Sequence, residues 1–173
     1  YDRHIKNIPS DCERLSSREA LVTILESIRS HQVKTLVAYN ISWDFEAIRN
    51  LVWFSGDGDD NALSLDSRAD NPFNPLGLQF VDLMHETVKK YGEELIRQGI
   101  QDGTVCRAQS SERILLRRNQ RYSKTVYSAE YALKYFFGAI QSHCADDDVA
   151  AEIKLLDKCI KDFGVEALEY NIL

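Results

Sequence analysis

The sequence predicts an α/β fold, and three observations support this prediction. Short apolar, β-rich runs occupy residues 35–39 and 78–83, as expected for strands in the middle of a covered sheet. Apolar residues at helical spacing precede, separate and follow these runs. The chain has 173 residues, of which 44% are hydrophobic and 28% are charged, so it is long enough to bury the core of one domain. We therefore expect residues 1–173 to form a single domain.

The first helix is expected to begin just after Ser16. Ser16 and Glu19 match the Ser-x-x-Glu pattern of a capping box, in which each residue satisfies a backbone N–H of the other. The apolar residues that follow fall on one helical face, and they are Leu21, Ile24, Leu25 and Ile28. This amphipathic helix would lead the chain into the strand at residues 35–39.

Residues 35–48 have the pattern of a strand, a sharp turn and a helix. Asn40 tolerates turn geometry, and Ser42 is a good N-cap for a helix with Phe45, Ile48 and Val52 on its apolar side. Asp44 would then lie in the first helical turn, beside the carboxyl end of the strand, where open α/β sheets bind their ligands. On its own, Asp44 is more simply interpreted as an acid that only stabilises a helix N-terminus.

Residues 55–77 are predicted to be a loop insertion, because they are rich in Gly, Asp, Asn, Ser and Pro. Residues 57–61 imitate the start of a calcium loop, but Ala62 and Arg68 occupy the positions that require Gly and Glu. The insertion is compatible with a solvated loop and with a lid near a substrate. After the second strand, the spacing of Val88, Tyr91 and Leu95 predicts a helix that ends near Gly99.

A last helix is predicted from Asp148 to about Phe163, with Gly164 as its stop signal. His143 lies five residues before Asp148 and would be on the preceding loop, so a base and a carboxylate come together. The simpler interpretation is that Asp146, Asp147 and Asp148 only cap the helix. Asp146 and Asp147 also compete with Asp148 for any ligand role, although the spacing favours Asp148.

The stretches around Asp44 and Asp148 together resemble two motifs of the DnaQ-like (DEDDh) 3′-to-5′ exonucleases. Asn40-x-x-x-Asp44 is similar to the second motif of this family, usually written H-N-A-x-F-D, with Tyr39 where a His is common. His143-x-x-x-x-Asp148 is similar to the third motif. The resemblance covers most of the chain and implies a ribonuclease H-like fold, a mixed sheet with flanking helices.

Two further features support the resemblance to the third motif. Residues 127–138 match the helix that leads into this motif. The tyrosine-type branch of the family replaces the histidine with a Tyr four residues ahead of the aspartate, and here that position is Cys144. The histidine branch is therefore indicated.

The resemblance implies a metal-dependent 3′–5′ exonuclease that hydrolyses phosphodiester bonds at single-stranded DNA or RNA ends. Such enzymes use two Mg²⁺ or Mn²⁺ ions about 3.5–4 Å apart, held by carboxylates. Asp44 and Asp148 would be the catalytic metal ligands, and His143 would be the general base, since its unperturbed pKa of about 6.5 suits proton transfer near neutral pH. Asn40 would contact the substrate. Asp82, at the end of its strand, would support the ligands from behind.

The first motif of this family is D-x-E on the opening strand, and the 173 residues contain no D-x-E at a predicted strand. In the family, this motif lies on the first strand of a three-stranded antiparallel unit, and that strand is central in the sheet. Two strands joined by a helix do not ordinarily form a stable parallel sheet. We therefore expect the domain to be N-terminally incomplete, with a further segment or a second chain completing the sheet beside residues 35–39. The alternative is a catalytically inactive exonuclease-like domain that acts as a binding or scaffolding module.

The charge distribution gives mixed information about nucleic acid. The net charge of −6 argues against a dedicated nucleic-acid-binding module, but not against a nuclease with an acidic, metal-filled site. Residues 107–124 are strongly basic, and in helical form Arg113, Arg117 and Arg121 would make one stripe able to grip phosphates. A solvated basic surface explains the stripe equally well. Residues 104–117 are also compatible with a hairpin.

The cysteine pattern predicts an intracellular protein, cytoplasmic or nuclear. The longest apolar runs are only a few residues, so we expect no membrane-spanning segment and no membrane partner. The four cysteines, Cys12, Cys106, Cys144 and Cys159, contain no C-x-x-C pair or metal-type spacing. We interpret them as reduced thiols.

Overall fold

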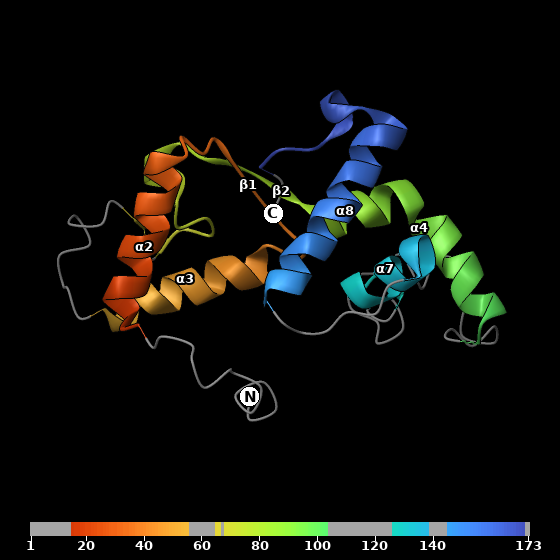
Figure 1. Ribbon diagram of the computed structural model, residues 1–173, viewed down its shortest axis with the longest axis horizontal. Coiled ribbons are helices and arrows are strands. Elements are labelled where there is room, and N and C mark those ends of the chain that lie inside the picture. Colours follow the sequence, from red (N-terminus) through yellow and green to blue (C-terminus); the bar gives the residue numbers. More distant parts are fainter. Residues whose placement is uncertain (1–14, 56–64, 67, 104–125, 139–144, 172–173) are drawn as a thin grey trace. The chain divides into compact units, whose positions relative to one another are not determined.

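The computed structural model describes residues 15–55, 65–66, 68–103, 126–138 and 145–171 (Figure 1). Within these residues the chain is mixed α/β and mostly helical, with one parallel sheet of two strands. It divides into two compact units. Unit 1 comprises Tyr1–Lys34 and Phe45–Leu78, and unit 2 comprises Thr35–Asp44 and Gln79–Leu173. The predicted α/β class is confirmed at this level.

Unit 1 begins with helix α2 (Ser17–Ser30), and the predicted capping box at its start is confirmed. The Ser16 hydroxyl accepts the Glu19 backbone N–H at 3.2 Å, while the Ser16 N–H donates to the Glu19 carboxylate at 2.7 Å. The helix buries three residues of its predicted apolar face, Leu21, Leu25 and Ile28. Local sequence alone therefore sets where this helix begins and which face it buries.

The remainder of unit 1 contains most of helix α3 (Ser42–Phe54) and a short 3₁₀ helix, η1 (Asn74–Leu76). The described part of the predicted insertion at residues 55–77 is irregular except for η1. It is not wholly solvated, because Leu65 and Phe73 are buried. The Phe73 ring packs against Phe45 of α3, with the ring centres 6.2 Å apart. Residues 57–62 lie outside the described residues.

Unit 2 is built on strands β1 (Thr35–Ala38) and β2 (Gln79–Asp82), which run parallel (Figure 1). The register places Thr35 opposite Gln79 and Ala38 opposite Asp82. Both predicted strands are confirmed, but each is shorter than expected. The chain turns immediately after Ala38, and the helix after β2 begins directly at Leu83.

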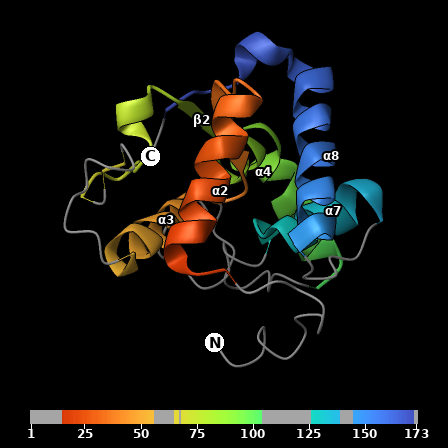
Figure 2. The same cartoon turned by 60° about the vertical axis from the view of Figure 1, so that its left-hand side comes forward.

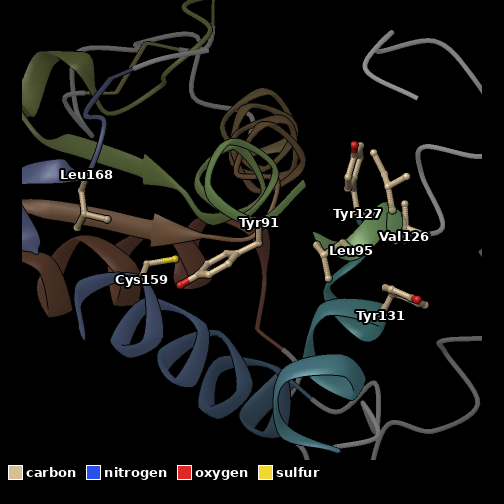
Figure 3. Close-up of a cluster of buried hydrophobic side chains, with 8 residues drawn as sticks. Tyr91, Leu95, Val126, Tyr127, Tyr131, Cys159 and Leu168 are labelled. Atoms are coloured by element: carbon tan, nitrogen blue, oxygen red, sulfur yellow. The ribbon is translucent and has the colours of Figure 1, made fainter. Parts of the chain in front are cut away.

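Three helices pack together in unit 2: α4 (Leu83–Gln101), α7 (Ala129–Phe137) and α8 (Ala145–Phe163). Each contacts the other two, and α8 also contacts the 3₁₀ helix η3 (Val165–Ala167) (Figure 2). Buried side chains from these segments form one cluster: Tyr91, Leu95, Ile96, Val126, Tyr127, Tyr131, Cys159 and Leu168 (Figure 3). No helix in the described part of the chain is long and apolar enough to span a membrane.

The ends of the unit 2 helices test the predicted stop signals. Gly164 follows α8 with a φ of 86°, a left-handed value that favours glycine, so the predicted end at Phe163 is confirmed. Helix α4 instead continues past the predicted end at Gly99 and finishes at Gln101. Gly99 is buried within the helix, so tertiary packing overrides its local tendency to break it.

The two strands of the sheet differ in how their outer edges are covered. Asn171 pairs with the outer edge of β2: the Phe80 N–H donates to Asn171 Oδ1 at 3.0 Å, and the Asn171 N–H donates to the Phe80 carbonyl at 2.9 Å. The outer edge of β1 has no strand partner among the described residues. Val37 of β1 is 37% exposed, whereas Val81 opposite it on β2 is 1% exposed. The expected further strand beside β1 stays a prediction.

Candidate functional site

The carboxyl ends of β1 and β2 are held together by one carboxylate, that of Asp82. Asn40 has a φ of 62°, and its backbone N–H donates to Asp82 Oδ1 at 3.0 Å. The same oxygen caps α4 by accepting the N–H groups of Met84 at 2.9 Å and His85 at 3.4 Å. Asp82 thus joins the end of each strand to the start of a helix. This contact gives physical content to the predicted supporting role of Asp82.

Asp44 lies in the first turn of α3, as predicted. The helix begins at Ser42 itself, so the predicted N-cap role of Ser42 is wrong, and its hydroxyl donates instead to Asn40 Oδ1 at 3.1 Å. Asp44 is exposed as a whole residue, yet nearby protein atoms desolvate its carboxyl group and raise its pKa. The charge of Asp82 raises this pKa further, while the backbone N–H of Asp44 lowers it.

Asp148 lies near the start of α8, as predicted, but the helix begins at Ala145, three residues before the predicted start. Its Oδ1 atom is buried and has no hydrogen-bond partner among the described residues. A buried carboxylate oxygen without a partner is costly, and a cation is a natural partner for it. Of the two competing aspartates, Asp147 is exposed, and the side chain of Asp146 lies outside the described residues.

Glu152 lies one helical turn after Asp148, on the same side of α8. Burial raises the pKa of its carboxyl group, and the backbone N–H of Tyr39 lowers it by a hydrogen bond. The negative charges of three aspartates raise the pKa further, in the order Asp44, Asp148 and Asp82. The charges of acids from three separate segments of unit 2 therefore disfavour the ionisation of Glu152.

Glu152 was not among the candidate residues selected from the sequence. The signal that identifies it is its spacing of four residues from Asp148 in a helical pattern, which places both acids on one face. That spacing alone is common on solvated helix faces. Only the fold shows that this face lies beside the end of β1.

Tyr39, at the position where the resembled family commonly has His, is half-buried. Its hydroxyl donates a hydrogen bond to the backbone carbonyl of Tyr127, just before α7. Desolvation, followed by the charge of Asp82, raises the pKa of Tyr39, so it stays a neutral donor. Tyr39 therefore connects the end of β1 to the segment that leads into the third motif.

The acids have the ligand type that a hard divalent cation prefers, but the described acids alone do not form a complete binding site. Oxygen ligands with negative charge are what Mg²⁺ and Mn²⁺ prefer, and a cation would relieve both the mutual repulsion and the unpartnered oxygen of Asp148. Among the residues that the structure describes, however, no group of three or more His, Cys, Asp or Glu side chains could hold a metal ion. Additional ligands would be needed to complete such a site.

Two of the residues predicted for the site, Asp44 and Asp148, belong to unit 2, and the charge of each raises the pKa of Glu152. Asn40 shapes the turn after β1, where its side-chain oxygen accepts the Ser42 hydroxyl. The predicted general base His143 and the predicted phosphate-binding residues Arg117 and Arg121 lie outside the described residues.

Comparisons of the chain with protein-family models, with curated proteins and with solved structures found no match. The resemblance to exonucleases therefore rests on the two sequence motifs and on the arrangement of acids that they mark.

Proposed function

We propose that this protein is a metal-dependent 3′–5′ exonuclease with a ribonuclease H-like fold, which hydrolyses phosphodiester bonds at single-stranded DNA or RNA ends. The observation that supports this best concerns Asp44 and Asp148, the two acids that the motifs select more than a hundred residues apart. Both belong to unit 2, and the negative charge of each raises the pKa of the Glu152 carboxyl group.

Asp44 and Asp148 would hold two Mg²⁺ or Mn²⁺ ions, which supply an activated water and stabilise the leaving oxygen. The residues of this chain do the rest. His143 accepts the proton of the attacking water, because an imidazole titrates near neutral pH. Arg117 and Arg121 hold backbone phosphates of the substrate. Asp82 keeps the ends of both strands in place, so that the ligands stay aligned.

The remaining ligands would come from a strand added at the outer edge of β1, either from a further segment or from a second chain. Neighbouring strands lie about 5 Å apart, so acids on such a strand would lie next to the carboxyl end of β1. Three observations are consistent with this arrangement: the unpaired edge of β1, the half-exposed Val37 and the incomplete set of acids among the described residues.

The direct test is the degradation of a 5′-labelled single-stranded oligonucleotide by the whole protein, including any residues that its gene encodes before Tyr1. We expect stepwise shortening from the 3′ end with Mg²⁺ or Mn²⁺ and none with a chelator. Asp44→Ala should abolish the shortening because a metal ligand is lost. Glu46→Ala, which removes an exposed acid from the same helix, should leave it unchanged. Full activity of Asp44→Ala would refute the assignment.

The alternative function is an inactive exonuclease-like binding or scaffolding module. One observation favours it, namely that the described acids do not form a group able to hold a metal ion. Binding of single-stranded oligonucleotides by the whole protein in chelator, without degradation in either Mg²⁺ or Mn²⁺, would support this alternative.

A further inference from the structure

The backbone at the end of β1 influences two acids. The Asn40 N–H donates to Asp82 at 3.0 Å, and the backbone of Tyr39 lowers the pKa of the Glu152 carboxyl group. Asp82 belongs to the junction of β2 and α4, whereas Glu152 belongs to α8. The turn at residues 39–40 is thus the point where the sheet meets two acids from different segments.

The side chain of Tyr39 reinforces this junction on the α8 side. Its ring packs against a cluster formed by Ala132 and Leu133 of α7 and Leu155 of α8, and Ala151 of α8 packs against the same cluster. On α8, Ala151 lies between Asp148 and Glu152 in the sequence, and Leu155 follows Glu152 by three residues. The Tyr39 ring therefore contacts the part of α8 that carries these acids, while its hydroxyl is fixed by the carbonyl of Tyr127.

We propose that Tyr39 is a positioning residue of the acidic site, which fixes Asp148 and Glu152 of α8 against the carboxyl end of β1. The inference rests on the proposed function, because it assigns Tyr39 to the same cation-binding acids. Tyr39 acts through two contacts: its ring with the cluster that joins α7 and α8, and its hydroxyl with the carbonyl of Tyr127. It is not a ligand and contacts no reacting atom in this role.

Tyr39→Phe isolates the contribution of the hydroxyl, since the ring and the amide remain. Tyr91→Phe is the matched control. The Tyr91 hydroxyl donates to Asp162 at 2.8 Å, so it also anchors α8, but at the end of the helix opposite to Asp148. Both variants lose one tyrosine hydrogen bond in unit 2, and both should lower the melting temperature by a few degrees.

The experiment measures Mn²⁺ binding to the whole protein by electron paramagnetic resonance, together with the Mn²⁺ concentration that gives half-maximal degradation of a single-stranded oligonucleotide. We expect Tyr39→Phe to weaken Mn²⁺ binding and raise this concentration by about three- to tenfold. At saturating Mn²⁺, the KM for the oligonucleotide should stay unchanged. Tyr91→Phe should alter neither the Mn²⁺ affinity nor this concentration. Tyr39→Ala should weaken Mn²⁺ binding more than Tyr39→Phe does.

Two results would overturn the inference, and they can be told apart. If the wild-type protein binds Mn²⁺ and Tyr39→Phe binds it equally well, Tyr39 has no positioning role, while the proposed function stands. If Tyr39→Phe and Tyr91→Phe weaken Mn²⁺ binding equally, Tyr39 likewise has no positioning role, because the weakening then reflects a general loss of stability. If the wild-type protein binds no Mn²⁺ at all, the proposed function fails and this inference fails with it.

Discussion

Asp82 and Asp148 are aspartates of the same unit with opposite environments. One oxygen of Asp82 accepts three backbone N–H groups, from Asn40, Met84 and His85. Asp148 has a buried oxygen without a hydrogen-bond partner among the described residues. The difference separates two uses of an acid near the end of a parallel sheet. Asp82 satisfies the backbone, whereas Asp148 is left with bonding capacity that the described protein does not use.

The same contrast applies to the two strands. β2 is buried and its outer edge is paired by Asn171, while β1 is half-exposed and its outer edge has no strand partner among the described residues. Among the described residues, the outer edge of β1 therefore lacks a strand partner and Asp148 Oδ1 lacks a hydrogen-bond partner. Both belong to the candidate site. The β2 side is the structurally completed half of the sheet.

The largest effect on stability should come from removing Asp82. Asp82→Ala leaves three backbone N–H groups without their acceptor and deletes the cap of α4. From the usual cost of lost caps and unsatisfied donors, we expect the free energy of unfolding to fall by about 2–4 kcal/mol. Urea unfolding monitored by circular dichroism measures this quantity.

Asp82→Asn is the control, because its amide oxygen can still accept these bonds, and it should retain most of the stability. A loss below about 0.5 kcal/mol for Asp82→Ala would mean that the three contacts contribute little, and the comparison with Asp148 would then collapse.

A smaller, pH-dependent effect should come from Glu152. Its pKa is raised in the folded protein, so the folded state binds the proton more tightly than the unfolded state. The associated stability is present at low pH and is lost as the pH rises through the folded pKa. We therefore expect Glu152→Gln to be more stable than wild type at neutral pH, with a difference that shrinks as the pH falls towards the ordinary glutamate range.

The measurement for Glu152 is the difference in unfolding free energy between variant and wild type at several pH values. Glu93→Gln, at an exposed position on α4, should show no such pH-dependent gain. If Glu152→Gln is less stable than wild type at neutral pH, Glu152 is held by favourable contacts, and the acids do not repel one another as described.

The smallest effect is expected for the predicted phosphate contacts. Replacing Arg117 and Arg121 by Ala should weaken binding of single-stranded oligonucleotides, and it should reduce the slope of log affinity against log salt by up to about 1.4, or about 0.7 per lost contact. Fluorescence anisotropy at several salt concentrations measures the slope. The paired replacement of Arg29 and Lys34 by Ala provides a control of equal charge. An unchanged slope would make residues 107–124 only a solvated surface.

The sequence predicted features that depend on neighbouring residues in the chain. The capping box at Ser16 and Glu19, both strands, and the stop at Gly164 are set by local chemistry and are confirmed. The sequence also predicted that Asp44 and Asp148 lie near the starts of helices, although α8 begins at Ala145, three residues before the predicted start.

Features that depend on contacts distant in sequence could not be predicted. Glu152 becomes notable only because α8 packs beside the end of β1, and Gly99 stays helical only because it is buried. Such outcomes are decided by tertiary packing, which a single sequence does not display.

The most direct test of the central claim compares Asp148→Ala with Asp82→Ala in the whole protein, by both unfolding free energy and Mg²⁺-dependent shortening of a single-stranded oligonucleotide. Asp148→Ala should lose at least about a hundredfold in rate, because a metal ligand is missing, while its unfolding free energy changes by less than about 1 kcal/mol. Asp82→Ala should be the less stable of the two. A variant Asp148→Ala that retains the wild-type rate, or that unfolds as readily as Asp82→Ala, would contradict the account.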